Sequence, residues 1–232
     1  MRKTKCILFL TIATAFSLAD ADDTAARLER AVSALSAMTR PEHGIRPEQI
    51  DSADCIAIIP GSKKGAAVIG VGYGQGSVSC GNGSWSAPAA VALESGSLGV
   101  QLGGEAIDIV ILSLDRERRP KLPCDRFTAG SEASAAWGNG KSAHEDPNSR
   151  ILLFGYTKSA FAGFGLDGAT LKPDESGDKA LYGQPLTNSE IVQDETETPV
   201  PARALITELA KESIRMSGHF SCASGDPGGS PV

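Results

Sequence analysis

The sequence predicts a single α+β domain. Its strongly coiled, mostly antiparallel and glycine-rich β-sheet, or barrel-like core, is flanked by an N-terminal and a C-terminal α-helix. Apolar or alternating runs of about four to eight residues recur between residues 55 and 171, separated by Gly, Asn, Ser and Pro clusters that indicate turns. Segments with apolar residues at helical spacing precede and follow this region. Gly70, Gly72, Gly74 and Gly76 alternate along one predicted strand, and such a stripe without side chains lets a sheet coil strongly.

Residues 1–21 have the pattern of a secretory signal peptide. MRKTK carries three positive side chains, an apolar run follows, and Ala19 and Ala21 are the small residues that precede a cleavage site. The apolar run of about 14 residues is shorter than the roughly 20 that a membrane-spanning helix requires. We therefore expect cleavage after Ala21 and a periplasmic or secreted protein.

The mature chain is expected to form one domain over residues 22–217, with a core at 47–193 and a disordered tail at 218–232. Flanking helices are predicted at 22–40 and 201–216. The first has Leu28, Val32, Leu35 and Met38 on one side, and this side either packs on the domain or lies on a membrane. Its charged residues do not form the strongly basic face that membrane-surface helices favour, so packing is the preferred interpretation.

Between the helices, the predicted strands begin with the buried run CIAIIP and continue through KKGAAVIGVGYGQGSVSC. Further strands are expected in residues 83–114, in SAAWG, in RILLFGYT and in FAGFGLDGATL. GNGS at residues 81–84 predicts a hairpin turn between Val78 and Trp85.

Charge and cysteine content limit the function classes. Loss of the signal peptide leaves 19 Lys and Arg against 27 Asp and Glu, a formal charge of −8, which argues against a nucleic-acid partner. Cys55, Cys80, Cys124 and Cys222 remain, and they permit two disulfides in three connectivities or four buried thiols. The three His are scattered and no CxxC occurs, so neither a metal nor another cofactor is expected.

The sequence contains no complete catalytic motif. Gly140-Lys141-Ser142 resembles the end of a phosphate-binding loop, but Ala135 stands where the pattern needs glycine, and no GxSxG occurs. An enzyme would have to assemble a site from residues such as Glu105, Asp108 and His144. We therefore predict a protein that is not an enzyme.

The acidic chain contains two basic clusters, one at Lys63 and Lys64 and one between Arg116 and Lys121. Lys and Arg are natural partners of a phosphate headgroup. The alternative is a solvated loop whose charges pair with neighbouring acids. The candidate headgroup residues are Lys63, Lys64, Arg116, Arg118, Arg119 and Lys121.

The order of motifs resembles the SYLF family of lipid-binding domains, and most closely its exported bacterial members. The resemblance covers roughly residues 47–193 and rests on CIAIIPGSKKGAAVIGVGYGQGSVSC, GSWSAPAAV, GSLGVQLGGEAIDIVILSL, TKSAFAGFGLDGATLKPD and ALYG in that order. It implies a compact α+β domain around a coiled, largely antiparallel sheet. Eukaryotic members bind phosphoinositides and a fungal member is associated with actin, but an exported bacterial protein meets no actin.

The resemblance also concerns individual residues. It implies a disulfide between Cys55 and Cys80, which would leave Cys124 and Cys222 as a second pair. Two positions depart from the family pattern: Gly81 stands where an arginine is expected, and Ala160 where a glycine is expected.

The leading hypothesis is an exported, non-enzymatic protein of the cell envelope that binds a phospholipid or a phosphoinositide-like headgroup. The six basic residues would contact the head, and Trp85, Phe161 or Phe164 would receive the acyl portion unless they belong to the core. The alternative is a structural or protein-interaction module of the envelope without a lipid ligand, whose helix at 22–40 serves another envelope protein.

Overall fold

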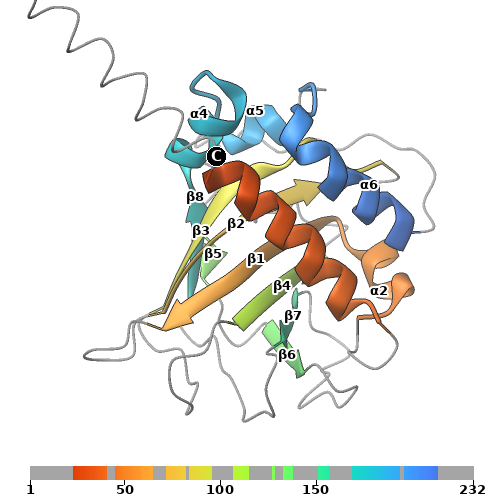
Figure 1. Cartoon of the computed structure of the whole chain (residues 1–232). Coiled ribbons are helices and arrows are strands. Elements are labelled where there is room, and N and C mark those ends of the chain that lie inside the picture. The colour runs from red at the N-terminus through yellow and green to blue at the C-terminus, as the bar shows by residue number, and fades with distance from the viewer. Residues whose placement is uncertain are drawn as a thin grey trace, which may run out of the picture.

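The computed structural model describes residues 23–40, 45–64, 72–81, 84–95, 107–114, 127–128, 133–137, 151–156, 169–193 and 196–213. Within these ranges eight strands form one sheet in the order β5-β8-β3-β2-β1-β4-β7-β6 (Figure 1). The strands are β1 (Cys55–Lys64), β2 (Gly72–Cys80), β3 (Ala89–Ser95), β4 (Ile107–Ser113), β5 (Phe127–Thr128), β6 (Ala133–Trp137), β7 (Ile151–Tyr156) and β8 (Thr170–Pro173).

The centre of this sheet is antiparallel. Six strands, from β8 through β3, β2, β1 and β4 to β7, each run opposite to their neighbours. β5 adds to one side antiparallel to β8, and β6 adds to the other side parallel to β7. β5 and β6 are the two edges of the described sheet, so it is an open coiled sheet and is not closed into a barrel. The predicted α+β class is confirmed.

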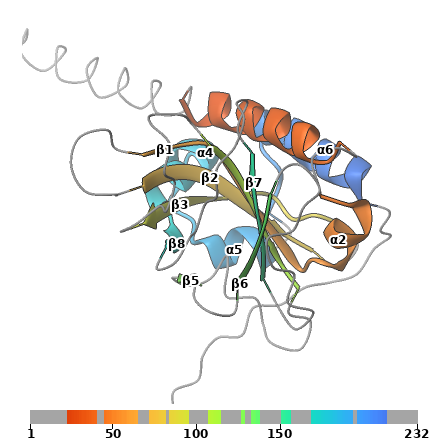
Figure 2. The same ribbon diagram turned by 90° about the horizontal axis from the view of Figure 1, so that it is seen from below.

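Helices cover both faces of the sheet. Figures 1 and 2 show a helix at residues 23–38, here the N-terminal helix, beside α6 (Arg203–Glu212) on one face, and Figure 2 shows α5 (Asn188–Gln193) on the other. The remaining helical elements lie before β1 and after β8. They are α2 (Pro47–Ser52), α4 (Glu175–Tyr182) and the 3-10 helix η1 (Val200–Ala202).

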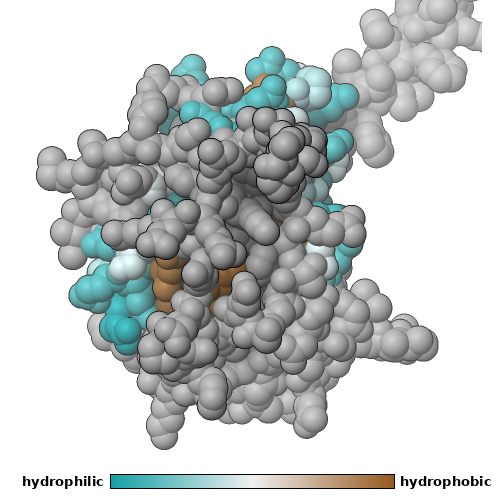
Figure 3. All heavy atoms as spheres, turned by 180° about the vertical axis from the view of Figure 1, so that it is seen from behind, coloured by the Kyte–Doolittle hydropathy of each residue, from teal (hydrophilic) through white to brown (hydrophobic). Residues whose placement is uncertain are grey.

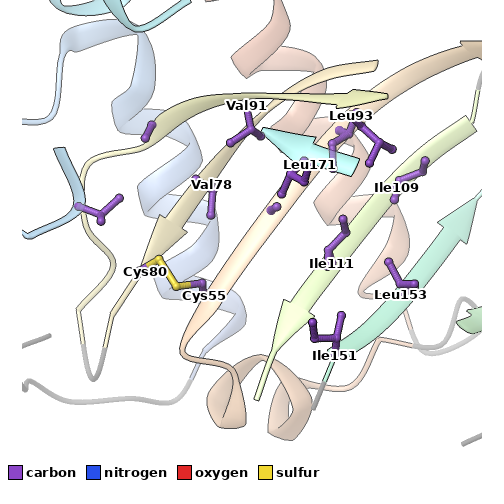
Figure 4. Packing of buried hydrophobic residues seen from close by; sticks show 14 of the residues in the cluster. Cys55, Val78, Cys80, Val91, Leu93, Ile109, Ile111, Ile151, Leu153 and Leu171 are labelled. Atoms are coloured by element: carbon purple, nitrogen blue, oxygen red, sulfur yellow. A yellow bond between two sulfur atoms is a disulfide. The ribbon is translucent and has the colours of Figure 1, made fainter. Parts of the chain in front are cut away.

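The central strands are buried on both faces, which explains why their sequences are continuously apolar. In β1, Ile56 and Ile58 pack in the cluster beneath the N-terminal helix and α6, whereas Ala57 and Ile59 belong to the cluster on the opposite face. Figure 4 shows this second cluster, where side chains of β2, β3, β4, β7 and β8 meet. Figure 3 views the molecule from behind, and hydrophobic residues are visible in the middle of a largely hydrophilic described surface.

An irregularity in β1 accounts for part of the coiling. The pairing of β1 with β2 shifts register between Ile58 and Lys63, and Gly61 adopts a φ of 60° there. The Gly61 N–H donates to Asp108 Oδ1 at 2.7 Å. A Cβ atom on Gly76 would lie 2.1 Å from the Ile58 carbonyl oxygen, so only glycine allows β2 to approach the bulge this closely. This contact concerns Gly76 alone among the four glycines of the predicted stripe, and Gly70 lies outside the described residues.

The N-terminal helix packs on the domain, as preferred from its sequence. Leu28, Leu35 and Met38 are buried in one cluster with residues of β1, β4 and α6. Because these side chains are already covered, the membrane-surface interpretation of this helix is not supported.

Two predicted elements require correction. The C-terminal helix was expected to run to residue 216, but α6 ends at Glu212 because Ser213 is extended and its N–H caps the Leu209 carbonyl. The predicted turn at residues 81–84 does not join two strand ends directly. β2 ends at Cys80 and β3 begins at Ala89, so Trp85 lies in the connection and not in a strand.

Candidate functional site

Three chain connections are attached side by side at one end of the sheet. The register pairs Lys64 with Gly72, Gly72 with Ser95, and Ser62 with Ile107. It also pairs Asp108 with Tyr156, and Glu94 with Thr170. This end, here the Lys64 end, is defined by Lys64, Gly72, Ser95, Ile107, Tyr156 and Thr170.

The connections that attach there have unusual sequences. Residues 65–71 read GAAVIGV, residues 96–106 read GSLGVQLGGEA, and residues 157–168 read TKSAFAGFGLDG. Glu105, Lys158 and Asp167 are their only charged side chains. Phe161, Phe164 and Glu105 belong to these connections and lie outside the described residues. The topology thus attaches three apolar, glycine-rich segments at the same end of the sheet as Lys63 and Lys64.

The other basic cluster is attached at the opposite end of the sheet. It follows Leu114, and Ser113 pairs with Cys55 at the first residue of β1. Since β1 has ten residues, the two ends are about 30 Å apart. The predicted headgroup residues therefore fall into two groups by their points of attachment. Arg116, Arg118, Arg119 and Lys121 themselves lie outside the described residues.

The disulfide lies at this opposite end. The structure joins Cys55 to Cys80 across the first pair of the β1–β2 ladder, with an S–S distance of 2.06 Å. This is the pairing that the family resemblance implies. Cys124 and Cys222 lie outside the described residues.

Two other candidate residues have structural roles. Trp85 is a core residue, 9 % exposed, and its Nε1–H donates to Ser213 Oγ at 3.1 Å, which ties the β2–β3 connection to the end of α6. Asp108, considered above as a member of an enzyme site, accepts the hydrogen bond from the Gly61 N–H in the β1 bulge. His144 lies outside the described residues.

A buried polar cluster surrounds Ala90, where β3 extends beyond its pairing with β8. That pairing stops at Val91 and Pro173, so the backbone groups of Ala90 need other partners. The Ala90 N–H donates to Asp178 Oδ1 at 2.6 Å. The Ala90 carbonyl accepts from the Asp174 N–H at 3.0 Å and from Asn188 Nδ2 at 3.1 Å. We call Ala90, Asp174, Asp178 and Asn188 the Ala90 cluster.

Asp174 caps the N-terminus of α4. Its Oδ1 accepts from the Gly177 N–H at 3.1 Å and from Ser176 Oγ at 2.6 Å, and its Oδ2 accepts from Gln75 Nε2 at 2.8 Å. Arg27 Nη1 of the N-terminal helix lies 3.8 Å from Oδ2. Burial opposes ionisation, but the hydrogen bonds and the Arg27 charge outweigh it and lower the pKa of this carboxyl below its usual value.

Asp178 has the opposite electrostatic environment. Its side chain is fully buried, and burial raises the pKa of the carboxyl from 3.8 to about 7, although the hydrogen bond from Ala90 opposes the shift. The negative charges of Asp174 and Glu175 raise it further. Asp178 Oδ2 and Asn188 Oδ1 are both buried and have no hydrogen-bond partner among the described residues. Tyr182 on the same helix donates to the Pro88 carbonyl at 2.8 Å, and burial raises the pKa of its hydroxyl.

A cleft of about 630 Å³ lies between α4 and α5, within the size range of small-molecule pockets. Its lining combines apolar and polar side chains, including Pro173, Ser176, Lys179, Leu186, Thr187 and Asn188.

The described residues offer little for metal chemistry. No three His, Cys, Asp or Glu side chains in these ranges are grouped as the ligands of a metal ion would be. The helices in the same ranges include none that is both long enough and apolar enough to span a bilayer.

The Ala90 cluster was not predicted from the sequence, although the residues that cap α4 at its two ends can be recognised there. Asp174 before a helical segment and Gly183 after it are an N-cap and a left-handed C-cap, and the structure has both around α4. The contacts with Ala90 span about 90 residues of chain, and no local pattern reports them.

The chain is similar to known proteins of one family. A family model named Ysc84 and described as "Las17-binding protein actin regulator" matches residues 94–212. Protein YSC84 of Saccharomyces cerevisiae is 27% identical over 193 residues, which cover 78% of this chain and 41% of that protein. SH3 domain-containing YSC84-like protein 1 of Xenopus laevis is 30% identical over 210 residues, covering 83% of this chain and 62% of that protein.

The human protein of the same name is 28% identical over 189 residues, covering 78% of this chain and 55% of the human protein. The chain thus spans about half the length of the curated relatives it matches. No solved structure matches it. The family model covers more than half of the 232 residues and extends from the end of β3 to the end of α6, that is, over β4 to β8 and the helices that follow them. The chain therefore belongs to the Ysc84 family, the SYLF family that its motifs resemble.

Proposed function

We propose that this protein is an exported, non-enzymatic lipid-binding protein of the cell envelope, and that it contacts a phospholipid membrane through the Lys64 end of its sheet. The observation that supports this proposal most is that three apolar, glycine-rich segments are attached at the same end of the sheet as Lys63 and Lys64. Membership of a binding family supports it.

The chemistry of this end suits an anionic lipid surface. Apolar side chains gain about 25 cal/mol per Å² when they leave water, and each Lys near an anionic surface contributes about 1 kcal/mol. The chain as a whole is acidic, so attraction to such a surface has to be local. The second basic cluster is attached at the opposite end and is a separate candidate for the same headgroups. We call its residues, Arg116, Arg118, Arg119 and Lys121, the Arg116 cluster.

Co-sedimentation with vesicles tests the proposal. The chain from residue 22 onward is mixed with vesicles containing phosphatidylglycerol or cardiolipin, or with neutral phosphatidylcholine vesicles, at low and high salt. We expect binding to the anionic vesicles, and a loss of about thirty-fold in affinity for Lys63→Gln/Lys64→Gln, because two lysines contribute about 2 kcal/mol.

The matched control is Lys179→Gln, since Lys179 is an exposed lysine on α4, away from the Lys64 end. A triple Arg116→Ala/Arg118→Ala/Arg119→Ala variant should bind like the wild type. If this triple variant alone loses binding, the Arg116 cluster is the headgroup site. If the wild type remains in the supernatant with every vesicle, lipid binding is wrong.

Export is tested separately, by the mass of the protein recovered from the periplasmic and secreted fractions of a bacterium that produces the full chain. A mass beginning at Asp22 supports cleavage after Ala21, and an intact N-terminus in the cytoplasm contradicts it.

A protein-interaction module is the second candidate, because the description of the matched family names a protein partner. The N-terminal helix is a poor surface for it, since its apolar side is buried in the domain. A protein that sediments with no vesicle but retains a single envelope protein in a pull-down would favour this candidate.

A further inference from the structure

The side chains of Asp178 and Asn188 are held next to one another by a single residue of β3. In an extended strand the N–H and the C=O of one residue point to the same side. The N–H of Ala90 binds the Asp178 carboxyl and its C=O binds the Asn188 carboxamide. The middle of α4 and the first residue of α5 therefore meet at this point.

Each of these two side chains has one oxygen left over. Asp178 Oδ2 and Asn188 Oδ1 are buried, and neither has a hydrogen-bond partner among the described residues. An unsatisfied buried polar atom costs about 1–3 kcal/mol, and more when it is charged. Two acceptor oxygens that share a buried site repel one another unless a donor lies between them.

A proton on Asp178 removes both deficits at once. A protonated carboxyl has one O–H donor, and Asn188 Oδ1 can accept its hydrogen bond. A cation is a weaker explanation, because Ca²⁺ takes six to eight oxygen ligands and the described residues group no three acidic, His or Cys side chains.

The surrounding charges favour the neutral carboxyl. Asp174 and Glu175 on α4 raise the pKa of Asp178, as does burial. The nearby cation Arg27 is held by Asp23 at 2.8 Å and faces Asp174. The other titratable groups on the packed elements are Lys179 on α4, which is exposed; Tyr182, bonded to Pro88; Glu190 on α5, bonded to Thr187; and Lys172 on β8, paired with Glu94.

We propose that Asp178 is a protonated carboxylic acid in the folded domain and that its Oδ2–H donates a hydrogen bond to Asn188 Oδ1, forming a latch between α4 and α5. Ionisation breaks this bond and leaves a buried carboxylate facing an amide oxygen. α4 and α5 are the two walls of the 630 Å³ cleft, so the latch controls how firmly these walls are held together. Alkaline conditions then loosen α4 and α5 relative to the sheet while the rest of the domain stays folded.

Carbon NMR of the whole mature chain, labelled with ¹³C at the Asp side chains, tests the latch directly. Asp178→Asn identifies the Asp178 resonance by its absence. We expect the chemical shift of a neutral carboxyl at pH 5.5 and a titration midpoint near neutrality. A carboxylate that is already ionised at pH 5.5 overturns the proposal.

A second variant distinguishes the latch from burial alone. Asn188→Ala removes the acceptor of the proposed bond, so the midpoint of Asp178 should fall by at least about one pH unit, a tenfold loss of proton affinity. Ser189→Ala, the matched control on the next residue of α5, should leave the midpoint unchanged. An equal midpoint in Asn188→Ala and the wild type contradicts the latch, and if Asn188→Ala does not fold, the wild-type titration still decides whether Asp178 is neutral.

Divalent cations provide the remaining check. Addition of Ca²⁺ or Mg²⁺ at millimolar concentration should leave the Asp178 resonance in place. A cation-dependent shift of this resonance together with a higher melting temperature would replace the proton by a metal ion and overturn the proposal.

Discussion

Ala90 has a methyl side chain, yet its backbone organises one end of the sheet. β8 stops one residue short of it, and three groups from α4 and α5 take the place of the missing strand. Gly177 of α4 packs so closely on this residue that a Cβ atom there would lie 2.8 Å from Ala90 Cβ. The backbone of a residue can therefore hold several elements together, and the residue type does not predict this.

The cysteines illustrate what residue-level reasoning can supply. Composition alone leaves three connectivities open, and the resemblance selects the Cys55–Cys80 pair that the structure contains. The basic residues show the opposite case. Their charges identify them in the sequence, but only the strand register reveals that Lys64 and the Arg116 cluster are attached at opposite ends of the sheet.

Gly81 gives a prediction at this scale. The family pattern has an arginine there, but a Cβ atom on Gly81 would lie 1.9 Å from the Ser84 carbonyl oxygen. We expect Gly81→Ala to lower the free energy of unfolding by about 1–3 kcal/mol, because the backbone at Ser84 has to move. Urea unfolding measures this change.

Gly183→Asn is the control for Gly81→Ala. Gly183 is an exposed helix C-cap with a φ of 72° and no atom within 4 Å of a Cβ position, and Asn tolerates this conformation. If Gly81→Ala lowers the free energy of unfolding less than Gly183→Asn does, the close approach of Gly81 to Ser84 does not contribute to stability.

Among the elements, β1 and β4 could be predicted from their sequences because burial on both faces makes the runs continuously apolar. α2 and α4 have six and eight residues, too short for a clear periodic pattern, and packing on the sheet stabilises them instead. α6 ends early because of Ser213, whose bond to Trp85 is a tertiary contact.

The N-terminal helix allows a prediction at the element scale. Leu35 is fully buried between this helix and the sheet, so Leu35→Ala should lower the free energy of unfolding by about 2–5 kcal/mol. Denaturant unfolding followed by circular dichroism measures the loss. Ser33→Ala is the matched control, since Ser33 is exposed on the same helix and its hydroxyl donates to the Glu29 carbonyl of the same helix. This variant should change stability by less than about 0.5 kcal/mol.

An equal effect of Leu35→Ala and Ser33→Ala would mean that the helix does not pack on the domain in solution. The membrane-surface interpretation of residues 22–40 would then return.

For the whole molecule, two carboxyls of the Ala90 cluster affect the free energy of unfolding in opposite directions as the pH changes. Asp178 determines its alkaline limb, where stability falls with rising pH, and Asp174 its acidic limb, where stability falls with falling pH. The pKa of Asp178 is raised, so the folded state binds more protons than the unfolded state between about pH 4 and pH 7, and stability falls as the pH rises through this window. The pKa of Asp174 is lowered, so its contribution is lost as the pH falls below 3.8. Stability should therefore be highest at mildly acidic pH.

The expected decline from pH 4 to pH 8 amounts to as much as about 4 kcal/mol for Asp178. Asp178→Asn removes the titrating group but keeps an acceptor for the Ala90 N–H, and it should flatten this limb while leaving the acidic limb unchanged. Urea unfolding at a series of pH values measures both limbs. A decline of the same size in Asp178→Asn would assign it to other groups.

The order of the strands was beyond the reach of the sequence. The predicted class, a coiled and mostly antiparallel sheet with flanking helices, is correct, but β1 lies between β2 and β4, and β3 pairs with a strand about 80 residues further along. Such pairings depend on which apolar faces meet after the chain collapses. Local periodicity reports the faces and not their partners.

The Cys55–Cys80 bond has one more consequence, for the fate of a damaged molecule. It closes residues 55–80, and with them β1, β2 and the connection at 65–71, into a covalent ring. A protease that cuts once within the ring opens it without releasing either piece, and the ladder between the two strands still holds the cut ends in register. On a denaturing gel the nicked protein keeps its full mass until a reductant is added. In a compartment that contains proteases and lacks reductants, the Lys64 end would thus withstand a single cut.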